Sequence, residues 1–213
     1  MNKIKLFVLH DCQLCPQMEK IFKNMYESGA VNSLEVMDVA HHPELAKQYN
    51  IRSVPFYLIN DVAFSGLKSA TDIRQLLGMD ETKKIEQQIS QLLTEGDLGS
   101  TQELVSSNEG ARKAMIQLLT NEDTELLIRI GLTAVFESLA PSGIFIEFEE
   151  QIKQMSEDTN ERIAIDAMYY LSLMATEGSL KHLSEIAQSN ASTILRDQAQ
   201  ELLEEHQEGA TLH

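Results

Sequence analysis

The sequence has only two cysteines and no long apolar run. Two cysteines are too few for the disulfide framework of a small secreted domain, which needs several spread along the chain. No apolar stretch approaches the ~20 residues of a membrane-spanning helix. The short apolar run at residues 6–9 is followed by no small-residue cleavage site of the kind that ends a signal peptide. We therefore expect a cytoplasmic protein without a membrane segment.

Positive charge is also scarce. The chain has 17 lysines and arginines against 33 acidic residues, and its formal net charge is −16. Residues 1–79 carry eight residues of each sign, so all of the net charge falls on residues 80–213. A strongly acidic segment repels nucleic acid and anionic lipid, and we exclude both as its partners. The uneven charge also predicts two domains, and the first would comprise residues 1–79.

The first domain has the pattern of alternating strands and helices. Apolar runs and alternation predict strands at 3–9, 33–39, 56–59 and 62–64, and helical spacing with its start and stop signals predicts helices from Cys15 to Gly29, at 42–49 and at 69–77. Asn60-Asp61 predicts a tight turn between the last two strands. The order βαβαββα predicts an α/β domain with a parallel core closed by an antiparallel hairpin.

The two cysteines, Cys12 and Cys15, lie between the first strand and the first helix. The thiolate is the reactive form of cysteine, and the N–H groups and positive dipole at a helix N-terminus lower its pKa. We expect Cys12, the more accessible thiol, to be the nucleophile and Cys15 to resolve the mixed disulfide. His10, if protonated, would favour the thiolate, whereas Asp11 would oppose it.

The segment Tyr49-Asn50-Ile51-Arg52-Ser53-Val54-Pro55, taken with Cys12-Gln13-Leu14-Cys15, resembles the thioredoxin/glutaredoxin superfamily over residues 3–78. The resemblance implies a thiol–disulfide oxidoreductase without a cofactor, with a role in cell redox homeostasis. It also implies a cis Pro55 facing the dithiol and a Val54 backbone presented to a bound substrate chain. Asn50 stands where the family often has glycine, and asparagine tolerates a positive φ. The chain departs from thioredoxins at Asp11, where tryptophan is common, and at Leu6, where a buried aspartate is common.

Two other interpretations of the dithiol stay open. A CxxC pair can form half of a zinc site, but zinc usually takes four ligands, and the chain has no second cysteine pair. We therefore expect no metal. The dithiol could also be structural, on a module that only binds a partner.

From residue 80 onward the sequence predicts only helices, and an internal repeat is its main feature. The apolar set Ile128, Leu132, Val135, Phe136 and Leu139 recurs 35 residues later as Ile163, Ala167, Tyr170, Leu171 and Met174, and its first four members recur as Leu195, Ala199, Leu202 and Leu203. Such amphipathic helices bury their apolar faces by stacking. We assign linking or capping helices to residues 80–107, repeats to 108–206 and a flexible tail to 207–213.

Residues 108–206 resemble HEAT-type helical repeats in their period and in segments such as ERIAIDAMYYLSLMA. A plain helical bundle is the alternative. The implied partners are a disulfide-bearing protein or small thiol at the dithiol and a protein client on the acidic repeat domain. The architecture resembles bacterial proteins that join a thioredoxin domain to helical repeats, some of them redox-linked chaperones. The alternative functions are therefore a non-catalytic scaffold or holdase and an adaptor switched by oxidation of the dithiol.

Overall fold

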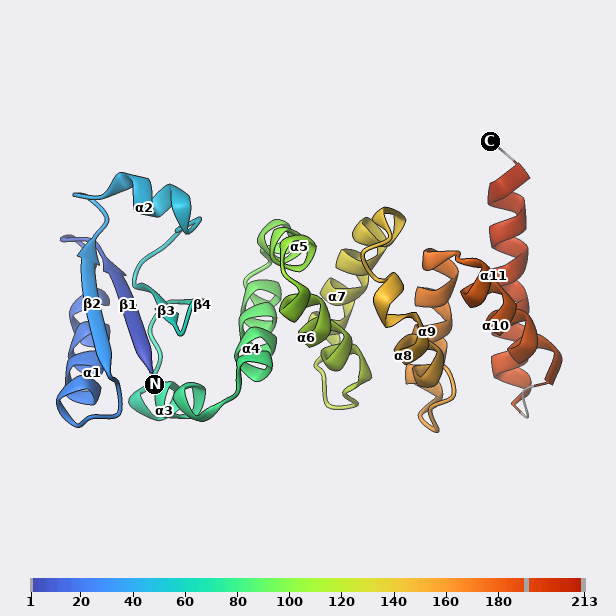
Figure 1. The fold of residues 1–213 in the computed structure, drawn as a ribbon, viewed down its shortest axis with the longest axis horizontal. Coiled ribbons are helices and arrows are strands. Elements are labelled where there is room, and N and C mark those ends of the chain that lie inside the picture. The colour runs from blue at the N-terminus through green and yellow to red at the C-terminus, as the bar shows by residue number, and fades with distance from the viewer. Residues whose placement is uncertain (1, 190–191, 212–213) are drawn as a thin grey trace. The chain divides into compact units, whose positions relative to one another are not determined.

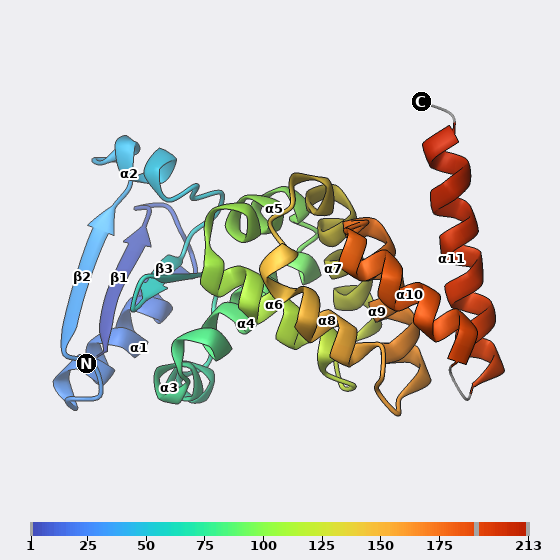
Figure 2. The ribbon, with the colours of Figure 1, turned by 45° about the vertical axis from the view of Figure 1, so that its right-hand side comes forward.

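The chain forms two compact units, Met1–Gln91 and Leu92–His213, and each is described by itself. The computed structural model describes residues 2–189 and 192–211 (Figures 1 and 2). The first unit is a mixed α/β structure and the second is helical, which confirms the predicted fold class. No single helix among the described residues is both long and apolar enough to cross a membrane.

The elements of the first unit follow the predicted order βαβαββα. They are β1 (Lys3–Val8), α1 (Cys15–Glu27), β2 (Ser33–Asp38), α2 (Pro43–Gln48), β3 (Phe56–Ile59), β4 (Val62–Ser65) and α3 (Ala70–Gly78), and then most of α4 (Glu81–Thr94). Asn60 and Asp61 both have positive φ and form the predicted tight turn between β3 and β4. Asn50 also has a positive φ, of 51°, as the sequence predicted.

The sheet has the strand order β2-β1-β3-β4. Its parallel part is the single pair β1–β2, because β3 runs antiparallel to both β1 and β4. The predicted parallel core is therefore smaller than two consecutive β–α–β units would make it. Between β2 and β3 the chain contains only the six-residue helix α2 and its connecting loops. The chain stays at the carboxyl end of β2, where Figure 2 shows α2, and re-enters the sheet from that end.

Alternating side chains of the strands serve the two faces of the sheet. On one face, Tyr57 of β3 meets Phe22 of α1 edge-on, with ring centroids 5.1 Å apart. On the other face, Phe7 and Phe56 belong to a buried cluster on which apolar side chains of α2 and of the following loop pack. This second cluster supports the loop that carries Val54 and Pro55.

The second unit is built from helices and their connecting turns. The helices are α5 (Leu98–Ser107), α6 (Glu109–Thr120), α7 (Leu126–Leu139), the short 3-10 helices η1 (Ala140–Ser142) and η2 (Ile146–Phe148), α8 (Glu149–Met155), α9 (Glu161–Met174), α10 (Glu177–Ser189) and α11 (Thr193–Thr211). The predicted tail from residue 207 begins inside α11, which continues through Thr211. The last two residues of that tail lie outside the described part.

The matched apolar positions of the sequence repeat lie in the core of this unit. Ile128, Leu132, Val135 and Phe136 of α7, their equivalents on α9, and Leu195, Ala199 and Leu202 of α11 are buried. Phe136 lies between Phe145 and Tyr170, with ring centroids 4.1 and 4.6 Å away, and so joins α7 to α9. Helix α8 packs on α9 and α10 on α11, while α9 contacts both α7 and α11. The assignment to HEAT-type repeats stays a prediction.

Candidate functional site: a dithiol at the start of helix α1

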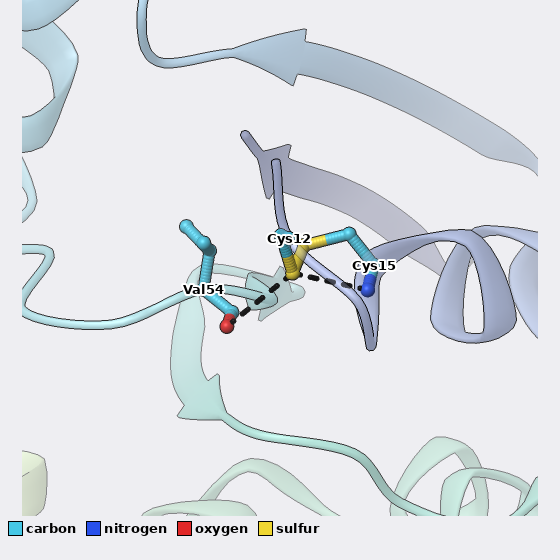
Figure 3. The surroundings of a disulfide bond; sticks show 3 residues. All are labelled: Cys12, Cys15 and Val54. Atoms are coloured by element: carbon cyan, nitrogen blue, oxygen red, sulfur yellow. Dashed lines mark hydrogen bonds between the residues drawn. A yellow bond between two sulfur atoms is a disulfide. The ribbon is translucent and has the colours of Figure 1, made fainter. Parts of the chain in front are cut away.

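Cys12 and Cys15 form a disulfide at the N-terminus of α1 (Figure 3). The chain leaves β1 at Val8 and turns at residues 9–12, where the Cys12 N–H donates to the Leu9 carbonyl oxygen at 3.1 Å. Helix α1 then begins at Cys15, whose side chain is only 2% exposed, whereas Cys12 is half-buried. Cys12 is therefore the more accessible of the two residues, as expected from the sequence.

The helix N-terminus provides a donor for Cys12. The backbone N–H of Cys15 donates to Cys12 Sγ over 3.1 Å (Figure 3). Pro16, in the first turn, has no N–H of its own to offer. When the disulfide is reduced, the Cys15 N–H and the positive end of the 13-residue helix favour a thiolate on Cys12 over a neutral thiol.

The loop before β3 lies against the dithiol. The Val54–Pro55 peptide bond is cis, as the resemblance implied. The Val54 carbonyl oxygen lies 3.7 Å from Cys12 Sγ (Figure 3). A disulfide sulfur carries no hydrogen, so this contact becomes a hydrogen bond only when Cys12 is a thiol that can donate. The Val54 side chain packs on the cluster of Phe7 and Phe56, which holds its carbonyl at this place.

Next to this loop, β4 ends in a turn that contacts Pro55. The N–H of Gly66 donates to the Pro55 carbonyl oxygen at 2.8 Å. Gly66 has a φ of 76°, a value that glycine adopts without the strain of a side chain. The structure thus brings together three segments distant in sequence: the dithiol, the cis-proline loop and the end of β4.

The two residues proposed to tune the thiols lie on the turn before Cys12. His10 and Asp11 occupy its central positions, and both are exposed. Their effect on the sulfurs stays a prediction. Leu6, at the place where thioredoxins often carry an aspartate, is fully buried in β1.

Sequence reasoning missed three exposed aliphatic residues on the segments that form the site. Leu9, Leu14 and Leu67 are all exposed. The backbone carbonyl oxygen of Leu9 accepts the Cys12 N–H, Leu14 lies between the cysteines, and Leu67 follows Gly66 in the sequence. In the sequence, Leu9 is the last residue of the strand predicted at 3–9. No local pattern predicts that its side chain is exposed. Leu14 likewise has the helical spacing of the buried residues Met18, Phe22 and Met25, so the sequence gives no hint that it is exposed.

The described residues contain no group of three or more histidines, cysteines or carboxylates that could hold a metal ion.

Comparison with known proteins supports a thioredoxin-like fold for the first unit. A family model described as a thioredoxin domain matches residues 2–78. No curated protein matches the chain. The matched segment contains every element from β1 to α3, the disulfide and the cis proline, while the helices from α4 onward lie outside it. Residues 2–78 are thus similar to a thioredoxin domain in sequence and have a thioredoxin-like fold.

Proposed function

We propose that the protein is a thiol–disulfide oxidoreductase in which Cys12 and Cys15 exchange electrons with the disulfide of a protein substrate. The observation that carries the proposal is the arrangement in Figure 3: a half-buried sulfur at a helix N-terminus, beside the carbonyl that precedes a cis proline, with its partner sulfur buried behind it. The match to the thioredoxin domain supports the same chemistry.

In the reducing direction the reaction has two steps. The Cys12 thiolate attacks one sulfur of the substrate disulfide, so a Cys12–substrate disulfide forms and the other substrate sulfur leaves as a thiolate. The Cys15 thiolate then attacks Cys12 Sγ, which releases the second substrate thiolate and forms the Cys12–Cys15 disulfide. Two electrons pass from the dithiol to the substrate, and a thiol reductant must return them before the next cycle.

The surroundings of the dithiol favour a protein over a small thiol as the substrate. Leu9, Leu14 and Leu67 offer exposed apolar surface that a polypeptide with apolar side chains near its cysteine would cover. Glutathione has no large apolar group to bury there.

The helical unit serves, in this proposal, to bind a protein partner or client. Its acidic charge suits basic segments. This second function does not depend on the dithiol. A specific group of exposed apolar side chains on α7 favours it and is described in the next subsection.

The test is turnover with single cysteine variants. We expect Cys12→Ser to reduce the rate of insulin reduction to the uncatalysed level, because it removes the attacking sulfur. Cys15→Ser should instead accumulate a mixed disulfide at Cys12, visible by mass spectrometry, because the second step is lost. The double variant, checked for an unchanged melting temperature, is the control for folding. Full turnover by Cys12→Ser would contradict the proposal.

The equilibrium reduction potential gives the direction of electron flow. Titration against glutathione and dithiothreitol buffers, with alkylated thiols counted by mass, would place a reductase near about −230 to −270 mV and an oxidant or isomerase near about −120 to −180 mV. If no disulfide forms across the whole range, the catalytic proposal fails and partner binding by the helical unit is left as the function.

A further inference from the structure

Three large aliphatic side chains are exposed to solvent at the start of α7. Leu126, Leu127 and Ile130 are 63%, 57% and 59% exposed. Residues three and four apart on a helix are neighbours, so Ile130 lies next to both leucines and the three side chains form one surface, here called the α7 patch. The opposite side of the same helix carries Ile128 and Leu132, which are buried in the core. The first turn and a half of α7 is therefore apolar on both sides.

The repeat itself shows that packing does not require the α7 patch. At the equivalent positions, α9 has Glu161, Arg162 and Ile165, and α11 has Thr193, Ile194 and Asp197. Helix α9 buries the same four core positions as α7 and α11 buries three of them, while both carry mostly polar residues at the places of the patch. A single exposed aliphatic residue is ordinary, but three adjoining ones on a helix that folds without them indicate a binding surface.

Negative charge borders the α7 patch. Glu122, Asp123 and Glu125, on the loop that leads into α7, are all exposed. Arg162 contacts this loop and is paired: its Nη1 lies 3.5 Å from Asp166 Oδ2, and its Nη2 donates to the Glu122 carbonyl oxygen at 3.4 Å. Arg129 lies beside the same Asp166, and its Nε is buried. The two arginines share the single carboxylate of Asp166, so one positive charge remains against the three carboxylates of the loop, and the balance of charge beside the patch is negative.

We propose that the α7 patch binds a segment of a partner protein that is both apolar and basic, such as a helix with large aliphatic side chains on one face and lysines or arginines beside them. Burial of Leu126, Leu127 and Ile130 would supply the free energy of binding. The carboxylates of the loop would select basic partners and speed their association. The proposal rests on the partner-binding half of the proposed function and is independent of the dithiol.

Charge also argues against the other occupants. A second copy of this chain, docked through the same patch, would bring two acidic loops together. An anionic membrane would meet the same repulsion. Membrane binding is nevertheless tested separately. Helix α7 and the bent segment after it together have the length and apolar composition of a membrane span that is broken in the middle.

The experiment measures binding of a fluorescent synthetic peptide, built from leucines at helical i, i+3 and i+4 spacing with lysines elsewhere, to the full chain by anisotropy. Replacing all three patch residues (Leu126→Gln, Leu127→Gln, Ile130→Gln) should weaken binding by about tenfold or more, which corresponds to about 1.4 kcal/mol. The matched control is Ile146→Gln with Ile194→Gln, because these residues are 56% and 57% exposed in the same unit but lie outside the patch. Equal affinity of the patch variant and the wild type would overturn the proposal.

A second pair of variants tests the role of charge. Neutralising the loop by Glu122→Gln, Asp123→Asn and Glu125→Gln should weaken binding and reduce its dependence on salt concentration. Neutralising three carboxylates of α11, by Glu201→Gln, Glu204→Gln and Glu205→Gln, should do neither. If both sets weaken binding equally, the attraction is that of the acidic chain as a whole, and the assignment to the α7 patch is wrong.

Two further measurements separate the other occupants. Self-association in sedimentation that the patch variant abolishes would overturn the proposal in favour of a second copy. Flotation with neutral or anionic phospholipid vesicles that the patch variant abolishes would overturn it in favour of a membrane. Because the patch residues are exposed, the variants should keep the wild-type melting temperature and the wild-type rate of insulin reduction. A peptide result therefore stands apart from any failure of the dithiol proposal.

Discussion

Tyr57, in the middle of β3, is fully buried and packs between Phe22 and Phe64, with ring centroids 5.1 and 6.0 Å away. Its hydroxyl group has no hydrogen-bond partner among the described residues. Burial raises the pKa of Tyr57 far above the usual range, with a smaller contribution from the negative charge of Asp72, so the side chain stays neutral. The ring stabilises the core through its apolar contacts, whereas an unsatisfied buried hydroxyl costs about 1–3 kcal/mol.

We predict that Tyr57→Phe raises the free energy of unfolding by about 1 kcal/mol, because it removes the unpaired hydroxyl and keeps the ring. Urea denaturation of the full chain, followed by a probe in the first unit, measures the change. Tyr57→Leu is the control and should lower stability, because the smaller side chain leaves a cavity between Phe22 and Phe64. A loss of stability in Tyr57→Phe would mean that the hydroxyl has a partner after all.

At the scale of elements, the carboxylate of Glu149 joins α8 to α10. It lies 2.8 Å from Lys153 Nζ and accepts a hydrogen bond from Thr176 Oγ1 at 2.7 Å. Gly178 lies so close that a Cβ there would collide with this carboxylate. Burial opposes ionisation of Glu149, but the hydrogen bonds from Lys153 and Thr176 outweigh it, and the pKa of Glu149 is lower than its usual value.

The lowered pKa predicts a pH-dependent stability. A carboxyl whose pKa falls on folding stabilises the folded state above its unfolded pKa, which is about 4.3 for glutamate, and this stability is lost as the pH falls through the folded pKa. The melting temperature of the helical unit should therefore drop below about pH 4. In Glu149→Gln it should be lower at neutral pH and depend less on acid, so the two curves converge at low pH. The control is Glu150→Gln, which removes an exposed carboxylate that also contacts Lys153; curves of Glu149→Gln and wild type that stay parallel would contradict the prediction.

At the scale of the whole molecule, the thioredoxin-like unit extends beyond the match that ends at residue 78. It includes α4 up to Gln91, whose Nε2 donates to the carbonyl oxygen and hydroxyl oxygen of Ser65 at 3.0 and 2.7 Å. Ile85 and Ile89 of the same helix are buried. Helix α4 thus covers the end of the edge strand β4, beside the turn that contacts Pro55.

We predict that a fragment ending at residue 94 is more stable than one ending at residue 79, the boundary expected from the sequence. Loss of α4 removes the two hydrogen bonds that Gln91 donates to Ser65, and one such bond contributes about 0.5–1.5 kcal/mol to the stability of the first unit. Urea denaturation of both fragments, each with the dithiol oxidised, measures the difference. Equal stabilities would show that α4 contributes nothing to the first unit and would favour the boundary at residue 79.

The sequence by itself determined the local features of this protein. Periodicity, turn residues and helix signals depend on neighbours within a few positions, and they placed the strands, the helices and the Asn60-Asp61 turn close to their observed bounds. The spacing of Cys12 and Cys15 before a helix indicated the pair that forms the disulfide, and the seven residues ending at Pro55 indicated the loop that lies against it. The internal repeat of the helices could also be predicted from the sequence, because each helix must present its apolar residues at the same offsets to stack on the next.

Only the tertiary structure decided what depends on contacts between distant segments. The antiparallel direction of β3 follows from the path of the chain around α2, which no local pattern records. The approach of the Val54 carbonyl to Cys12 depends on the packing of Val54 against Phe7 and Phe56. The sequence does not predict the exposure of Leu14 near the dithiol or of Leu127 on α7, because an apolar residue type is compatible with both a surface and a core position. The burial of a side chain depends on the residues that pack around it. Burial therefore distinguished the apolar residues of the core from those that are exposed and available to a partner.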